Sequence, residues 1–310
     1  MKRLWIILFA GAIAIIFFTG CWAEKAPKDS QTQINPNEES ANLEKIPVTL
    51  YYQYNDAFLL AGEVRTIEAP VNGRIENAVI HALVEGPEAK SQGLNVLLHP
   101  GTKVINVTEE GGYLFVTLSG DFIKTEITDE KESIRRQLAV YSIVNTLVEL
   151  GGYARVQLRV DRDMSGIGQS ITKAEAGFDD TEDALEPLGY YSPVALNPKN
   201  ALNEFFKNYA DKDWEKVYES IAYMDISGDI KPSQDEFLSG IVSFQYGMEE
   251  YEVMDYYTGA DNKTALVLVD FSIKTKSGES RTEKNMPLRL IRENSVWRLS
   301  YSSFKKVFAF

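Results

Sequence analysis

The sequence is nearly devoid of the residues that support thiol and metal chemistry. It contains one cysteine, Cys21, and two histidines, His81 and His99. A single cysteine excludes a disulfide within the chain, and without a spaced Cys/His cluster we predict no zinc site. The glycine-rich stretch Gly166–Ser170 lacks the lysine of a phosphate-binding loop. We therefore expect no catalytic residue, no metal and no cofactor.

Basic residues are also scarce. Lys and Arg number 32 against 45 Asp and Glu, which gives a net charge of −13. Binding to nucleic acid or to anionic lipid by charge needs a basic face, so we expect neither. Hydrophobic residues make up 44% of the chain and aromatic residues 11%, a composition that is typical of folded domains.

The N-terminus has the pattern of a secretory signal. The basic pair Lys2–Arg3 precedes the apolar run Leu4–Phe18, which is shorter than the roughly 20 residues of a membrane span. Phe18–Cys21 resembles the bacterial lipobox, with Phe18 in place of the usual leucine. In a lipobox the cysteine becomes the first residue after cleavage and receives lipid. We predict a lipoprotein signal peptide over residues 1–20 and a lipid such as palmitate on Cys21, outside the cytoplasm. An ordinary signal peptide or a signal anchor is the alternative.

The remaining 290 residues exceed the usual size of a single core, so two domains are expected. Residues 21–46 are polar and predict a flexible tether. The first domain is placed at 47–161 and the second at 199–310. Between them, residues 162–198 are rich in Gly, Ser and acidic residues. They predict a flexible linker, or an extended arm that packs on the first domain.

The first domain alternates strand and helix patterns. Runs of β-branched and aromatic residues predict strands over 48–54, 63–68, 103–108, 112–119 and 155–160. Helical spacing predicts one helix over 75–83, N-capped by Asn72 and ended by Gly86–Pro87. A second helix is predicted over 129–150, N-capped by Thr128. This order gives an α+β layer, with helices on one face of a mainly antiparallel sheet.

Several short pieces of this domain, taken in order, resemble the GerM domain. They are Val48–Tyr52, Glu85-Gly86-Pro87, Pro100-Gly101-Thr102, Val116–Ser119 with Phe122, and Gln137-Leu138 with Tyr141. The resemblance implies a role in sporulation or spore germination and fits a lipoprotein, because lipoproteins often carry this domain. It also implies a module similar in character to those that build rings and scaffolds in cell envelopes. No catalytic residue is implied.

The second domain combines helices with a later set of strands. Helices are predicted over 202–209, 214–221 and 233–243, and strands over 251–257, 264–273, 283–292 and 296–301. Such an order is typical of an α+β domain with an antiparallel meander. Residues 203–218 together with Val296–Leu299 resemble the cone-shaped superfamily of nuclear transport factor two. Its members include enzymes and non-catalytic envelope domains, so this resemblance does not fix a function.

A few groups of polar residues are candidates for a catalytic, calcium or ligand site. His81 with Glu85 has the spacing of a base and its orienting carboxylate, and a solvated helix face explains the pair equally well. His99 is interpreted as a turn residue. Two acidic groups have some character of a calcium site, although both lack the full ligand pattern; they are Asp179, Asp180, Glu182, Asp183 and Glu186, and Asp225, Ser227 and Asp229. In the second domain a pocket would be lined by Tyr256, Tyr257, Asp270 and Arg289, with Asp270 inside.

The sequence therefore favours a non-enzymatic lipoprotein on the outer face of the cytoplasmic membrane. It would present interaction modules to envelope or sporulation proteins, bind no nucleic acid, and leave homo-oligomerisation open. The alternative is a small-molecule binding or enzymatic pocket in the second domain. An interior filled by Phe271 and Trp297 would count against that pocket, and an open one lined by Asp270 would support it.

Overall fold

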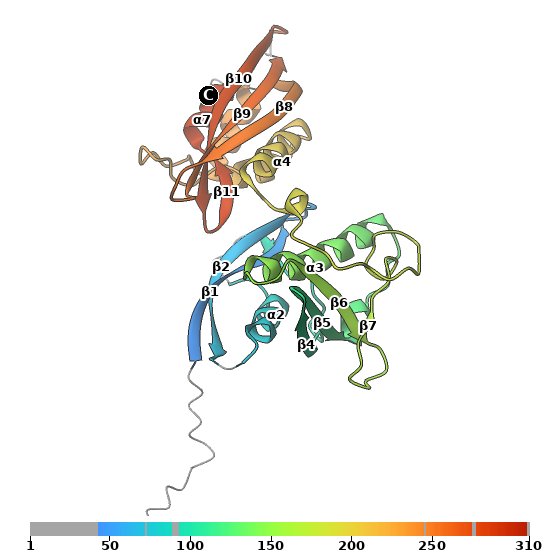
Figure 1. Cartoon of the computed structure of the whole chain (residues 1–310). Helices are drawn as coiled ribbons and strands as arrows, with labels where there is room; N and C mark the ends of the chain where they lie inside the picture. Colours follow the sequence, from blue (N-terminus) through green and yellow to red (C-terminus); the bar gives the residue numbers. More distant parts are fainter. Residues whose placement is uncertain (1–42, 72, 89–92, 245, 275–276, 309–310) are drawn as a thin grey trace, which may run out of the picture. The chain divides into compact units, whose positions relative to one another are not determined.

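The computed structural model describes residues 43–71, 73–88, 93–244, 246–274 and 277–308. The predicted signal sequence, the predicted lipidation site Cys21 and the predicted helix cap Asn72 lie outside the described residues. Three sheets and the helices that pack against them form the α+β fold expected from the sequence (Figure 1). None of the described helices is long and apolar enough to cross a bilayer.

The first sheet is a long hairpin with a short third strand. β1 (Leu43–Tyr54) pairs antiparallel with β2 (Leu60–Pro70), and β3 (Leu94–Asn95) pairs with the end of β1. Order was expected to begin at Pro47, and β1 begins four residues earlier. The extra residues, Leu43–Ile46, are mostly exposed and only half apolar, so they form no β-branched or aromatic run that would predict a strand. Their pairing with the last residues of β2 makes them a strand.

The second sheet has one parallel pair. Its strand order is β4 (Val104–Glu110), β5 (Tyr113–Ser119), β6 (Arg155–Asp161) and β7 (Gln169–Ser170). β4 and β5 form the predicted hairpin, and the η1 turn (Gly120–Ile123) follows β5. β6 runs parallel to β5 because helix α3 (Glu130–Glu149) forms the crossover between them.

Helix α3 lies between these two sheets. On one side, the Tyr51 N–H in β1 donates to Thr146 Oγ1 at 3.1 Å, and Ser142 Oγ donates to the Tyr51 carbonyl at 2.6 Å. On its other sides α3 contacts β6 and helix α2 (Ile75–Glu85). Buried apolar side chains run around it: Leu138, Val140, Ile143, Val144 and Leu147. A helix that is apolar all round is an enclosed helix. The layer predicted as helices on one sheet is thus two sheets that share α3.

The helix ends follow local chemistry closely. The Asp129 carboxylate accepts the N–H of Glu132 at 2.8 Å, so the N-cap of α3 is Asp129 and not the predicted Thr128. Helix α2 ends at Gly86, as predicted. The φ angle of Gly86 is 97°, in the region that favours glycine.

Residues 162–198 pack along the second sheet. The backbones of Val156 in β6 and Leu188 form an isolated bridge, and Ile171 is fully buried. The stretch Gly166–Ser170 lies in the β6–β7 hairpin, where the Asp161 carboxylate accepts the N–H of Gly166 at 2.9 Å. Of the two alternatives predicted for residues 162–198, these contacts favour the extended arm that packs on the first domain over the flexible linker.

The third sheet is antiparallel and follows a group of helices. The helices are α4 (Pro198–Ala210), α5 (Trp214–Glu219) and α6 (Gln234–Phe244), with the η2 turn (Ser192–Val194) before them. The strands are β8 (Gly247–Thr258), β9 (Thr264–Lys274), β10 (Ser280–Glu293) and β11 (Val296–Leu299), in the order β11-β10-β9-β8.

The chain closes with a helix that the sequence did not predict. The last strand was expected to reach Tyr301, but β11 ends at Leu299 and Tyr301 begins α7 (Tyr301–Phe308). Two side chains accept N–H groups of its first turn: Ser300 Oγ from Ser303 at 3.2 Å, and Asp225 Oδ2 from Ser302 at 2.9 Å. These contacts stop the strand and start the helix.

Candidate interaction surfaces

The residues predicted to line a pocket in the C-terminal region lie on the solvent side of the third sheet. Along β9, Ala265, Val267, Val269, Phe271 and Ile273 are buried, and the residues between them are exposed or half-buried. Asp270 does share a face with Leu266 and Leu268, as predicted, but this is the outside of the sheet. The expectation that Asp270 lies inside is wrong, because the odd-numbered residues of β9 make the more apolar face.

The inside of this sheet is filled by aromatic side chains. The ring of Phe206 in α4 stacks on that of Phe271 at a centroid distance of 6.4 Å, and Phe304 in α7 is fully buried. Phe271 and Trp297 are only 2% and 6% exposed. These side chains occupy the space where the small-molecule pocket was expected.

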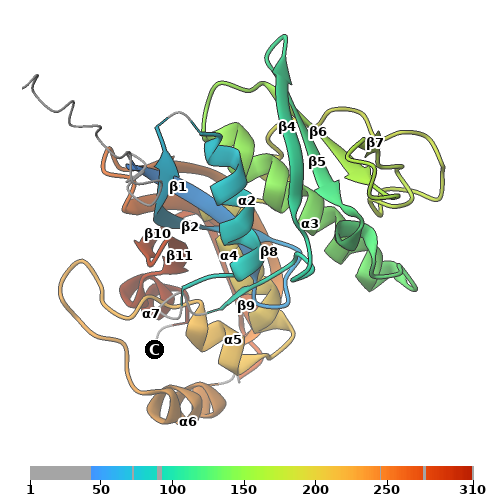
Figure 2. The ribbon, with the colours of Figure 1, turned by 90° about the horizontal axis from the view of Figure 1, so that it is seen from below.

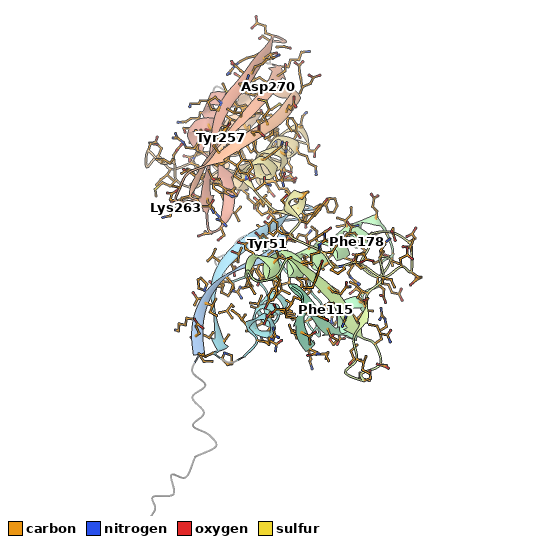
Figure 3. All side chains as sticks on the ribbon, viewed as in Figure 1. Tyr51, Phe115, Phe178, Tyr257, Lys263 and Asp270 are labelled. Carbon is orange, nitrogen blue, oxygen red and sulfur yellow. The ribbon has the colours of Figure 1, made fainter. Side chains whose placement is uncertain are left out.

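We name the solvent side of the sheet the outer face. Register defines it, since directly opposed residues of an antiparallel pair point to the same side. Tyr257 is opposite Leu266, which is opposite Arg289; Glu252 is opposite Asp270; and Leu268 is opposite Pro287. Three of the four predicted pocket residues, Tyr257, Asp270 and Arg289, belong to this face. The fourth, Tyr256, follows a bulge in β8 and is also exposed. Figure 3 labels Tyr257 and Asp270 on the sheet.

The two histidines are placed as structural residues. His81 Nδ1 lies 3.5 Å from Glu85 Oε1, and both side chains are largely exposed on α2. An exposed ion pair one helical turn apart contributes little to stability. Its solvated position does not provide a buried environment that would make the histidine reactive. His99 Nδ1 accepts the N–H of Gly101 at 3.1 Å, which confirms its interpretation as a turn residue.

The acidic groups are engaged in local hydrogen bonds. Asp179 accepts from both the N–H and the hydroxyl of Thr181. Asp225 accepts from the N–H groups of Ile226 and Ser302. In the described part of the chain, no three His, Cys, Asp or Glu side chains come together as a metal-binding group.

A hollow of about 420 Å³ lies around Lys231, but its charged groups hold backbone in place. Lys231 Nζ donates to the carbonyls of Tyr218 at 2.8 Å and Ile221 at 2.9 Å. Burial, with a smaller contribution from the nearby Arg298 charge, lowers the pKa of Lys231 to about 8. A lysine with a lowered pKa is a candidate nucleophile. Here both carbonyl contacts point to a role in fixing the loop that ends at this residue.

That loop carries a concentrated set of exposed apolar side chains. The connection between α5 and α6 is long, as Figure 2 shows. Within it, Tyr223, Met224, Ile226 and Ile230 are 59%, 47%, 56% and 54% exposed. We name residues Tyr223–Ile230 the apolar loop. Exposed apolar clusters of this kind commonly mark binding surfaces, whereas single exposed apolar residues do not.

Hydrogen bonds fix the conformation of the apolar loop. The Asp225 N–H donates to the Asp229 carbonyl at 2.7 Å, and the Gly228 N–H donates to the Asp225 carbonyl at 2.9 Å. The Glu293 carboxylate accepts the N–H groups of Tyr223 and Met224. The alternating Asp225, Ser227 and Asp229 predict, at most, a calcium site. Their apolar neighbours were the signal of a surface.

Comparison with known proteins identifies the N-terminal region. Residues 49–163 match the Germane family, which is described as "Sporulation and spore germination". This part of the chain is therefore a GerM-type domain, and the match supports a role in sporulation or germination. The match covers most of the first two sheets, although not β7, and all of α3, and it confirms the resemblance to the GerM domain. No curated protein matches the chain.

Solved structures add related proteins. The tandem GerMN domains of the sporulation protein GerM from Bacillus subtilis are 18% identical, with 47% of this chain and 46% of that chain covered and a TM-score of 0.33. The first GerMN domain of the same protein is 21% identical, covering 37% and 83%, with a TM-score of 0.27. A candidate lipoprotein from Clostridium perfringens is 20% identical, covering 48% and 89%, with a TM-score of 0.28. The chain thus spans less than half of the tandem-domain structure, and the identification rests on the family match.

Proposed function

We propose that this protein is a lipid-anchored, non-enzymatic interaction module on the outer face of the cytoplasmic membrane, acting in sporulation or spore germination. The apolar loop is the observation that carries the proposal. Four large apolar side chains protrude from a backbone that is already fixed, so binding costs little ordering of the loop. Asp225, Glu293 and Lys231, which lie in or beside the loop, form hydrogen bonds with backbone groups.

The proposed anchor explains how modest affinity could suffice. Lipid on Cys21 would hold the body to the bilayer through 22 residues before β1 begins at Leu43. The polar composition of this segment predicts a flexible chain, whose root-mean-square span is roughly 25 Å for this length. Tethering would raise the effective concentration of the apolar loop near membrane partners. The C. perfringens relative, described as a candidate lipoprotein, supports the same location.

The loop is tested by comparing two matched double variants. Ile226→Ser with Ile230→Ser removes apolar side chains from the apolar loop. Met164→Ser with Ile167→Ser removes two comparably exposed side chains from the β6–β7 hairpin. After crosslinking in native membranes, the first variant should recover envelope or spore proteins at roughly one tenth of the wild-type level, the usual effect of losing a hot spot. The second should resemble wild type. Equal recovery from both variants would overturn the role of the loop.

The anchor is tested separately. Cys21→Ser should release the protein from the membrane and abolish its contribution to spore formation or germination, while the soluble fold keeps its melting temperature. Full activity of the secreted, unlipidated form would refute the anchored mechanism. The interaction role of the apolar loop would still be decided by the comparison of the two double variants.

A further inference from the structure

Another hollow lies within the GerM-type domain, beside the first half of α3. Its volume is about 290 Å³. One wall is apolar and comes from the segments on either side of the β4–β5 hairpin; it is made of Leu97, Leu98, Phe122 and Ile127. Small-molecule sites commonly combine such a wall with a few polar groups that fix the orientation of the ligand. The polar groups of this hollow therefore decide what it can bind.

The charged side chains of the hollow are not paired with one another. Two cations, Arg135 and Arg136, and two carboxylates, Glu126 and Glu132, line it. Among the residues that the structure describes, none of these four side chains lies within ion-pair distance of an opposite charge. Charges of both signs thus line the same small space without neutralising each other.

Arg136 is the charge with the least compensation. It is only 8% exposed, and its guanidinium donates to two carbonyls, that of Thr125 at 2.6 Å and that of Glu175 at 3.0 Å. The Glu175 carboxylate is instead paired with Arg162, at 2.6 Å. Burial lowers the pKa of Arg136, and the charges of Glu175 and Glu132 offset this effect only in part. A buried charge is unfavourable without a counter-charge, so a carboxylate that enters the hollow is stabilised there.

The hollow offers further groups of both kinds. Arg135 is exposed and supplies a second guanidinium. His99 Nδ1 accepts a backbone N–H, so its neutral ring carries the proton on Nε2 and can donate it. On the acidic side, the carboxylates of Glu126 and Glu132 accept no hydrogen bond from any residue that the structure describes. These carboxylates are therefore available to an ammonium group.

We propose that this hollow binds a free α-amino acid with an apolar side chain. The carboxylate of the ligand lies against Arg136 and Arg135, its ammonium against Glu126 or Glu132, and its side chain against the apolar wall. A simple anion or cation compensates only one of the two signs, whereas a zwitterion compensates both. A peptide carries its two terminal charges on different residues, so a single amino acid suits a hollow of this size better. The site is independent of the apolar loop and adds ligand binding to the proposed interaction role.

Binding is tested on the purified full-length protein in detergent by isothermal titration calorimetry. Leucine should bind saturably with a Kd of about 1 mM or tighter. Leucinamide lacks the carboxylate and isocaproate lacks the ammonium, so each should bind roughly tenfold more weakly, because a contact to a charged group is lost. Glycine lacks the apolar side chain and should also bind more weakly. No saturable binding of leucine, or isocaproate bound as tightly as leucine, would overturn the proposal.

Substitutions assign each charge to one end of the ligand. Arg135→Gln should weaken the binding of leucine and isocaproate without weakening that of leucinamide. Glu126→Gln combined with Glu132→Gln should weaken leucine and leucinamide without weakening isocaproate. This crossed pattern separates a loss of contact from a loss of fold, since a misfolded variant would bind none of the three ligands. Equal weakening of all three ligands by either variant would contradict the assignment.

Two control variants change nearby exposed charges that do not line the hollow. Lys124→Gln and Glu130→Gln lie on the same two segments as the tested residues and should leave all three affinities unchanged. Arg136 is kept in every variant, because its two carbonyl contacts also hold the surrounding backbone. An effect of the control variants as large as that of the tested ones would show that general surface charge, and not this hollow, governs binding.

Discussion

Lys231 is bound twice by Tyr218. Its ammonium nitrogen lies 3.8 Å from the centroid of the Tyr218 ring and donates to the carbonyl of the same residue at 2.8 Å. The Tyr218 hydroxyl in turn donates to the Pro232 carbonyl at 2.9 Å, directly after Lys231. The end of α5 and the end of the apolar loop are therefore fastened to each other from both sides. A cation over a ring and a charged donor both contribute more when partly buried.

The lowered pKa of Lys231 predicts a rise of stability in mild alkali. Burial brings this pKa from 10.5 to about 8. Between these values the unfolded chain keeps the proton and the folded chain releases it, so the free energy of unfolding increases with pH. After allowance for solvent screening of a half-buried group, the gain is roughly 1 kcal/mol. Denaturant unfolding at pH 8 and pH 9.5 would measure it.

Two comparisons sharpen this measurement. Lys231→Met should lower stability at both pH values, because two carbonyls lose their donor, and should flatten the pH slope. Lys124→Met, at an exposed lysine, should leave the slope unchanged. An unaltered slope in Lys231→Met would contradict the assignment. Above pH 10 the slope should reverse, since burial raises the pKa of Tyr51, Tyr52 and Tyr209 and only the unfolded chain ionises there.

The start of α3 gives a prediction with an adjacent control. Asp129→Ala removes the acceptor for the Glu132 N–H and should destabilise the protein by about 1 kcal/mol, the usual value of an N-cap. Thr128→Ala changes the neighbouring exposed residue and should cost much less. Chemical denaturation of both variants, compared with wild type, distinguishes the two positions. A larger loss for Thr128→Ala would show that the cap is assigned to the wrong residue.

A buried carboxylate near the start of α2 has two partners, the Tyr153 hydroxyl and the Arg74 guanidinium, which lies 3.6 Å from Glu76 Oε1. Glu76 is 2% exposed, and its Oε1 accepts a hydrogen bond from the Tyr153 hydroxyl. Burial, together with this contact, raises the pKa of Tyr153 to about 12. Tyr153→Phe leaves the carboxylate with a lost donor and should cost about 1–3 kcal/mol. Thermal unfolding would measure the loss.

A matched substitution shows whether the hydroxyl matters through Glu76. Tyr113→Phe removes a hydroxyl from a tyrosine that is 39% exposed and should change stability little. In a Glu76→Gln background the cost of Tyr153→Phe should become smaller, because a neutral amide tolerates the loss better than a charge. An unchanged cost would assign the effect of Tyr153 to its ring packing.

Much of the fold is readable from the sequence where local pattern and tertiary packing agree. The β4–β5 hairpin follows from two alternating strands and the turn Gly111-Gly112, whose φ angles are 60° and 80°. α4 follows from the spacing of Leu202, Phe205 and Phe206, all buried. In both cases one local signal is sufficient to place the element.

The predictions are wrong where contacts with residues far away in the sequence decide the local structure. One of the two caps of α7, Ser300, is local, but the other is Asp225, which lies 77 positions before the Ser302 N–H that it accepts. No local pattern around Tyr301 contains that partner. At Leu266 and Leu268 the two faces of β9 are about equally apolar, so these positions do not show which face is inward; the odd-numbered residues pack against α4. The apolar loop was not predicted, because its alternating acids indicate a calcium site. The apolar residues around them form the exposed surface: Tyr223, Met224, Ile226 and Ile230.

The position of α3 between two sheets determines how this region responds to destabilising substitutions. A helix with one solvent face can absorb changes there, and α3 leaves little such freedom over its central turns. A core substitution such as Ile143→Ala would loosen the packing of both neighbouring sheets at once. The two sheets should consequently lose their amide protection together in hydrogen exchange, as one cooperative unit.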